Sequence, residues 1–191
     1  MLYIKGDEAT RLQNVLFTIY FQCKDIREAI KQYFICTNLE DNRILEKLND
    51  FPSLFSTILD SMRYRIVIGM GNIFDNNPKS LSIWKLLNLC EQEGKEKLNK
   101  EVKKIRNELS NYKDTIENIN TLRDKMYGHI EIKYLLEIED IYDKNFEFLN
   151  TQILLSKKIL NYIMEECVKL SKEYDDDKLG LHFSLNFDKK K

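Results

Sequence analysis

Proline, glycine and an excess of charge of one sign are what this chain of 191 residues most lacks. It has two prolines and six glycines, and because these residues interrupt helices, long segments remain free of them. The Lys-, Glu-, Leu- and Ile-rich composition, with a period of about 3.5 to 3.6 residues, predicts long helices and an all-α fold. The formal net charge of −1 excludes a global basic field, so any contact with RNA needs a local patch.

Sequence motifs of several enzyme classes are also missing. The chain has no Gly-rich dinucleotide loop, P-loop, His-Glu-x-x-His pair or serine nucleophile motif, which argues against nucleotide hydrolysis, zinc proteolysis and acyl transfer. Cysteines occur only at scattered positions, without a Cys-x-x-Cys pair or a histidine at ligand spacing; they are Cys23, Cys36, Cys90 and Cys167. We therefore expect four buried free thiols, and neither a metal nor another cofactor.

Targeting and membrane-spanning segments are not recognisable in the sequence. The N-terminus, Met1 to Gly6, lacks the layout of a signal peptide, and the apolar run from Ile66 to Met70 is far too short to span a bilayer. We expect a cytoplasmic protein without a membrane partner.

Apolar residues recur at three- and four-residue steps along most of the chain, which predicts a bundle of about five helices. Pro52 suits the first turn of one helix, and Pro78 suits the start of another. The predicted helices cover residues 7–37, 52–74, 78–90, 94 to beyond 119, and 137–172. Composition marks no boundary inside them, so we expect one domain over residues 1–174 and a short tail over 175–191.

The fourth predicted helix carries the most regular pattern, a heptad stripe flanked by Lys, Glu and Asn. Its members are Leu98, Val102, Ile105, Leu109, Tyr112, Ile116 and Ile119. Such a narrow seam packs against one partner, either another helix of the same bundle or a second copy of the chain.

The tail changes to a period of two, with apolar residues at every second position from Leu181 to Phe187. This alternation predicts a strand or an extended arm. Because a lone strand leaves its backbone groups unpaired, we expect it to pair with residues 2–4 or with another copy's tail. His182 lies on its polar face and reads as a surface residue, and the last three lysines are expected to be disordered.

Arg123 and His129 are the two residues whose chemistry does not fit a purely structural helix. If the heptad pattern continues past Ile119, it predicts apolar residues at positions 123, 126 and 130. Position 123 is instead an arginine. On a straight helix Arg123 and His129 lie about 120° apart, so one helix does not point both at one phosphate. Two solutions remain open: Gly128 bends or ends the helix, or the two groups meet their counterparts across a two-fold axis.

An arginine, a polar residue and then a histidine near a helix break resemble the R-x(4–6)-H motif of the HEPN superfamily. The segment Leu122-Arg-Asp-Lys-Met-Tyr-Gly-His129, with the preceding Ile73-Phe-Asp75 and Lys79-Ser-Leu-Ser-Ile-Trp84, most resembles its phage abortive-infection (AbiU2-like) branch. In layout the resemblance spans about residues 10 to 170.

The resemblance implies a homodimeric, metal-independent endoribonuclease of a phage-defence or toxin system, with a composite R-x5-H site between two copies. RNA carries its own nucleophile, the 2′-OH, so the enzyme moves protons and stabilises the charged phosphate. His129 would act as general acid or base, Arg123 would hold the phosphate, and Asp124 would orient one of them. The RNA substrate is not specified as tRNA or mRNA, and an antitoxin or a larger defence effector is a further partner.

Four other residues are candidate RNA contacts: Lys125, Tyr127, Arg63 and Arg65. Tyr127 also suits packing, and the two arginines of the second predicted helix also suit pairing with nearby carboxylates. Glu131 stands where some HEPN toxins carry a tyrosine that an antitoxin modifies, so regulation by that route is in doubt.

A rival interpretation is a helical module without catalysis that binds RNA or a protein. Arg123 would then form a structural salt bridge with a carboxylate, since a fold alone does not establish activity. A third interpretation is a helical bundle that binds a larger effector protein through the heptad seam. A buried, carboxylate-paired Arg123 far from any cleft favours the rival.

Overall fold

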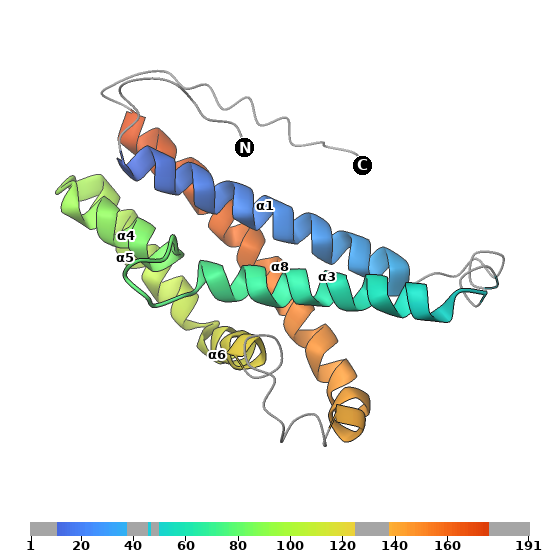
Figure 1. Cartoon of the computed structure of the whole chain (residues 1–191). Coiled ribbons are helices and arrows are strands. Elements are labelled where there is room, and N and C mark those ends of the chain that lie inside the picture. The colour runs from blue at the N-terminus through green and yellow to red at the C-terminus, as the bar shows by residue number, and fades with distance from the viewer. Residues whose placement is uncertain (1–10, 38–45, 47–49, 125–137, 176–191) are drawn as a thin grey trace.

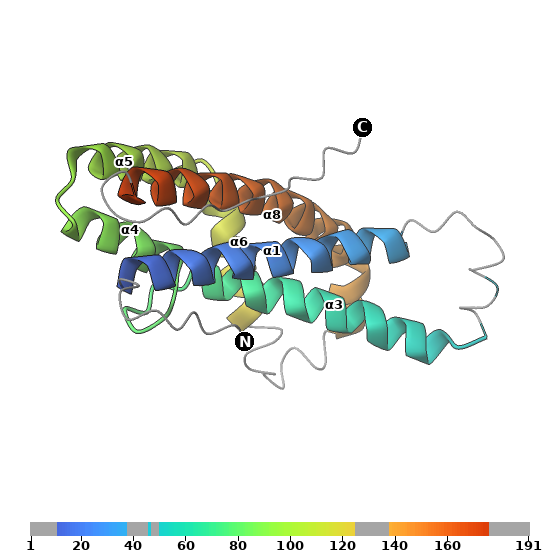
Figure 2. The ribbon, with the colours of Figure 1, turned by 90° about the horizontal axis from the view of Figure 1, so that it is seen from above.

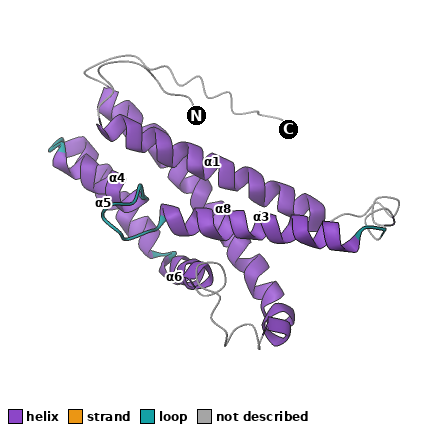
Figure 3. Ribbon diagram, viewed as in Figure 1, coloured by secondary structure: helices purple, strands orange, loops and turns teal. Residues whose placement is uncertain are grey.

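The computed structural model describes residues 11–37, 46, 50–124 and 138–175, with side chains of the last helix from Phe148 onward. Every element in these ranges is a helix, and no strand occurs among them (Figure 3). The helices are α1 (Arg11–Thr37), α3 (Pro52–Ile73), α4 (Ile83–Gln92), α5 (Glu96–Ser110), α6 (Lys113–Leu122) and α8 (Ile138–Asp175). The predicted all-α bundle is confirmed.

Three long helices form the centre of the bundle. Figure 1 shows α1 lying along α3 while α8 passes behind both, and α1 packs against both of them. On α1 the fully buried side chains include Ile19, Cys23, Ile30 and Tyr33, which follow the helical spacing of the apolar stripe. Burying each large aliphatic side chain stabilises the fold by roughly 1.5 to 3 kcal/mol, so this stripe determines which face of α1 points inward.

The shorter helices cover one end and one side of this centre. α4 and α5 pack against each other, and α5 lies alongside the C-terminal part of α8 (Figure 2). α6 packs against α3 and α8. This arrangement brings the end of α6, where the Arg123 motif begins, against the last turns of α3.

The helix expected from Pro78 begins later, at Ile83, and ends at Gln92. Side chains in the preceding turn explain the difference: Asp75 Oδ1 accepts the Asn77 backbone N–H at 3.0 Å, and Asn77 Oδ1 accepts that of Lys79 at 3.0 Å. These local hydrogen bonds offer the backbone an alternative to the helix. Ser82 then has an extended backbone (φ −120°, ψ 166°) before the helix starts.

The heptad segment is two helices rather than the single one expected. The first ends at Ser110, where the Ser110 hydroxyl donates to the Asn107 carbonyl at 2.6 Å and the backbone N–H groups of Asn111 and Tyr112 bond three residues back. Serine and asparagine favour such bonds at helix ends. The seam nevertheless continues in phase, and its members are buried or packed against the core within one chain. Of the two partners expected for the seam, the one inside the same bundle is confirmed.

All four cysteines are free thiols, as expected, and three of them are buried. Cys36 is partly exposed, which corrects that part of the prediction. Burial and the neighbouring Cys167 raise the pKa of Cys23 well above its usual value. Burial also raises the pKa of Cys90 and of Cys167 to about 12, so these thiols remain protonated and inert at neutral pH.

Among the described helices, none is long and apolar enough to cross a membrane. The expected tail strand, its pairing with residues 2–4, His182 and the terminal lysines all lie outside the described residues.

Candidate functional site at the ends of α3 and α6

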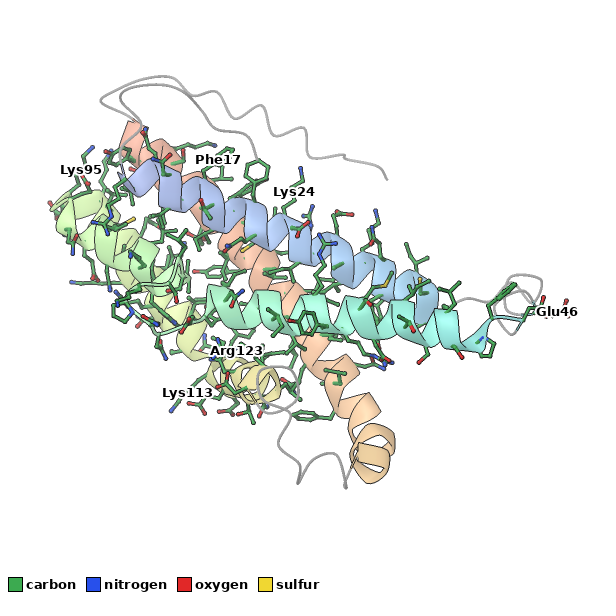
Figure 4. All side chains as sticks on the ribbon, in the orientation of Figure 1. Phe17, Lys24, Glu46, Lys95, Lys113 and Arg123 are labelled. Carbon is green, nitrogen blue, oxygen red and sulfur yellow. The ribbon has the colours of Figure 1, made fainter. Side chains whose placement is uncertain are left out.

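Arg123 lies at the end of α6 and points toward the last turns of α3 (Figure 4). Its Nη1 donates to the Gly71 carbonyl at 3.0 Å, and its Nε donates to Asp124 Oδ1 at 2.7 Å. The side chain is 22% exposed. Arginine carries five N–H donors in a planar fork, so these two bonds orient the guanidinium and leave its Nη2 edge without a partner among the described residues.

Gly71 allows the close approach of Arg123 to α3. A Cβ at this position would lie 2.5 Å from Arg123 Cδ and 3.2 Å from its Cγ and Nε. Only glycine therefore lets the arginine stem lie against the helix backbone while its end reaches the carbonyl. The sequence prediction missed Gly71, although two glycines within the apolar interior of one helix, at 69 and 71, signal close packing.

Asp75 follows α3 and faces the same region. Its carboxylate accepts the Ser80 hydroxyl at 2.6 Å and the Asn77 backbone N–H at 3.0 Å. These hydrogen bonds, and to a lesser extent the positive charge of Arg123, lower the pKa of Asp75. Next to it, the Phe74 carbonyl accepts the Trp84 indole N–H at 3.1 Å, which fixes the turn between α3 and α4.

Arg63 is in a different environment, inside the bundle. It is 8% exposed, its Nε donates to Tyr33 Oη at 3.2 Å, and its Nη1 donates to Asp60 Oδ1 at 2.8 Å. The Tyr33 hydroxyl in turn donates to Asn150 Oδ1 at 2.7 Å, so the network links α1, α3 and α8. Burial alone would lower the pKa of Arg63, but the bond to Tyr33 and the charge of Asp60 outweigh it and raise the pKa. The pairing expected for this residue is present.

Arg65 points to the surface and pairs with Asp25 of α1, both side chains being more than half exposed. The two residues line an open groove of about 450 Å³ between α1 and α3. Its lining residues are Gln22, Asp25, Ile26, Tyr64, Arg65, Ile68, Gly69 and Asn72. The groove extends to Asn72, the residue that follows Gly71 on α3.

The remaining predicted site residues, Lys125, Tyr127, Gly128 and His129, lie outside the described residues, as does Glu131. The described part of the motif therefore consists of Arg123 and Asp124. No group of three or more His, Cys, Asp or Glu side chains that could hold a metal ion occurs within the described ranges.

No curated protein and no solved structure matches the chain. The sequence profile of the AbiU2 family of HEPN domains matches residues 18–181, a range that includes all six helices apart from the first turns of α1, and also Arg123 and His129. The chain therefore belongs to the AbiU2 family, a HEPN-type family of abortive-infection proteins.

Proposed function

We propose that the protein is a metal-independent endoribonuclease of a phage-defence or toxin system, in which Arg123 and His129 act on the scissile phosphate. The observation that carries this proposal is the arrangement of Arg123. The Gly71 carbonyl and Asp124 bind two of its three nitrogens, Nη1 and Nε, and Nη2 has no partner among the described residues. A fixed planar fork with a free edge is suited to a phosphate oxygen pair.

The reaction needs two proton transfers and charge stabilisation. A base removes the proton of the ribose 2′-OH, the oxygen attacks phosphorus, and an acid protonates the leaving 5′-oxygen, which yields a 2′,3′-cyclic phosphate and a 5′-hydroxyl end. A histidine has an ordinary pKa of about 6.5 and serves in either role near neutral pH. Arg123 stabilises the extra negative charge of the pentacoordinate phosphate.

The site is proposed to be composite, formed by two copies of the motif in a homodimer. The support is the family: a composite R-x5-H site is what membership of a HEPN-type family implies, and a two-fold axis would bring the arginine of one copy to the histidine of the other. Asp124 keeps the Arg123 fork in position, and Lys125, Tyr127 and Arg65 contact the RNA on either side.

The test is cleavage of labelled single-stranded RNA by the purified protein in the presence of EDTA, with analysis of the product ends. We expect 2′,3′-cyclic phosphate ends for the wild type and a loss of about 10²- to 10⁴-fold for His129→Ala and for Arg123→Ala. Arg106→Ala is the matched control, because Arg106 of α5 is paired with Glu91 of α4 and belongs to no part of the proposed site. An uncut substrate for wild type, at every RNA tried, contradicts the proposal.

Mixing the two inactive variants tests the composite site separately. If each site takes its arginine and histidine from different copies, a one-to-one mixture of Arg123→Ala and His129→Ala regains part of the activity. Solution mass checks that a dimer is present. A mixture as inactive as its components would remove the dimeric part of the proposal.

A second candidate function is a module without catalysis that binds RNA or a protein. One observation favours it: Arg123 is more than three-quarters buried and paired with a carboxylate. In that case Arg123→Ala lowers the melting temperature of the protein. His129→Ala then changes neither the amount of RNA that is cleaved nor the growth of cells that produce the protein.

A further inference from the structure

The groove between α1 and α3 is lined by both apolar and polar residues. Its apolar lining includes Ile26, Ile68 and Gly69, and Tyr64, which also lines it, is half exposed. Its volume of about 450 Å³ falls within the range of about 300 to 1,000 Å³ that holds small organic groups. An aromatic side chain beside small apolar groups is a typical setting for a stacked nucleobase.

Two amide side chains supply hydrogen-bonding groups for the edge of such a base. Asn72 is exposed on the α3 side of the groove. Gln22 lies on the α1 side, and its Oε1 is buried without a hydrogen-bond donor from the described residues. A buried, unsatisfied amide oxygen destabilises a protein, and a ligand with an amino group at this position removes that cost.

A cation is held loosely at the groove. Arg65 pairs with Asp25, and both side chains are more than half exposed, so the pair contributes about 0 to 1 kcal/mol. A phosphate can therefore replace Asp25 as the partner of Arg65, or bind beside it, at little energetic cost.

The groove lies beside the Arg123 site. Gly71, which holds Arg123, and Asn72, which lines the groove, are consecutive residues of α3 and point about 100° apart. The two sites therefore flank the same last turns of the helix, and at a helix diameter of about 10 to 12 Å two directions 100° apart are separated by about 8 to 9 Å at its surface. Three stacked nucleotides, at about 3.4 Å each, cover such a distance.

We infer that the groove is a nucleobase subsite for unpaired RNA, two or three nucleotides from the phosphate held by Arg123. The base stacks on Tyr64 beside Ile26 and Ile68, Gln22 and Asn72 bind its edge, and Arg65 contacts the adjoining phosphate. This inference rests on the proposed function and adds to it a source of sequence preference. RNA is favoured over a helix of another protein because the groove is lined by two amides and an ion pair.

An apolar strip better suited to a helix lies elsewhere on α3. Phe51, which precedes the first residue of α3, is 65% exposed, and Leu54 and Ile58 in the N-terminal half of the helix are 60% and 38% exposed. The groove residues stand in its C-terminal half. Because the two surfaces differ in chemistry and position, a variant in the strip is a matched control for a variant in the groove.

The test uses short single-stranded RNAs that carry each of the four bases in turn at positions near the cleaved bond. We expect Tyr64→Ala to lower kcat/KM about 5- to 100-fold through KM and to reduce the difference between bases. Gln22→Met, of similar shape, should also reduce the base preference while the melting temperature of the free protein stays equal or rises by about 1 to 3 °C. Phe51→Ala, at an exposed aromatic that precedes the same helix, should cleave like wild type.

Fluorescence anisotropy with the same labelled RNAs separates the inference from the proposed function. If wild type binds these RNAs with a base preference that Tyr64→Ala abolishes, the subsite stands even where no cleavage occurs. If wild type cleaves RNA and both groove variants keep its kcat/KM and base preference, the subsite is refuted and the proposed function remains. If the groove variants instead lower the solution mass, the groove contacts a second copy and the inference is wrong.

Discussion

Arg63 and Arg123 both lie on helices of the bundle and both bind a carboxylate, but the rest of their surroundings differ. Arg63 is 8% exposed and donates to Tyr33 and Asp60 inside a network that joins three helices. Arg123 donates to a backbone carbonyl and to its own sequence neighbour, and one edge of its guanidinium remains without a partner among the described residues. Removing Arg63 should therefore change stability, and removing Arg123 should change activity.

Replacing Arg123 and Arg63 by lysine, one at a time, should give the largest difference between the two sites in cleavage rate and in free energy of unfolding. Lysine keeps the charge but loses the planar fork, so it cannot bind Gly71, Asp124 and a phosphate together. We expect Arg123→Lys to lower RNA cleavage about 10²-fold and to leave the free energy of unfolding within about 0.5 kcal/mol. Cleavage rates and urea unfolding of the two lysine variants measure this. Equal cleavage by Arg123→Lys and wild type would mean that charge alone, rather than the oriented fork, acts on the substrate.

Arg63→Met tests the structural half of the comparison. The change leaves Tyr33 bonded to Asn150 but removes the hydrogen bonds from Arg63 to Tyr33 and Asp60. The buried bond to Tyr33 is worth about 1.5 to 3 kcal/mol, and the pair with Asp60, whose side chain is 45% exposed, about 0 to 1 kcal/mol. A loss of about 2 kcal/mol lowers the melting temperature by roughly 4 to 8 °C for a chain of this size. Cleavage measured well below that temperature should stay near the wild-type rate. Arg106→Met, at an exposed ion pair, should cost less than about 1 kcal/mol.

The two glycines of α3 test what holds Arg123 in place. A Cβ at Gly71 meets the flexible Arg123 side chain at 2.5 Å, whereas a Cβ at Gly69 meets Ile26 at 2.7 and 2.8 Å. Gly71→Ala should therefore displace the guanidinium and lower cleavage about 10-fold, while the better helix propensity of alanine offsets the clash in stability. Gly69→Ala should instead cost about 1 to 3 kcal/mol, because Ile26 belongs to the core. Thermal melts and cleavage assays of both variants distinguish the two outcomes.

The apolar periodicity of the sequence predicted the bounds of the long helices. It did not predict where a helix is interrupted because local side-chain hydrogen bonds compete with the helical ones. The stripes of α1, α3 and α8 predicted those helices within a few residues, because burial follows the apolar period. The break after Ser110 was missed because the seam continues in phase across the turn. The late start of α4 was missed because the Asp75 and Asn77 side chains bind the backbone.

For the site, the sequence predicted that Arg123 lies on the seam and that Asp124 orients either Arg123 or His129. In the structure Asp124 accepts the Arg123 Nε–H within the same chain, and the roles of both residues in a site remain predictions. The Gly71 carbonyl was not predictable, because 52 residues separate it from Arg123 and only the packing of α6 on α3 brings them together. The roles assigned to His129, Lys125 and Tyr127 remain predictions.

Asp75 gives the smallest expected effect and shows how the turn beside Arg123 responds to pH. Its folded-state pKa is lowered from 3.8 by the Ser80 hydroxyl, the Asn77 N–H and, more weakly, Arg123. Because the unfolded chain binds this proton at a higher pH than the folded chain, the stabilisation is fully present above about pH 4 and is lost as the pH falls through the folded-state value. Urea unfolding of wild type should therefore show a loss of stability in that window which Asp75→Asn lacks. Ser80→Ala removes the first of these bonds and should flatten the same part of the curve without changing the charge, so a wild-type pH dependence in Ser80→Ala would assign the effect to the Asn77 N–H and Arg123 instead.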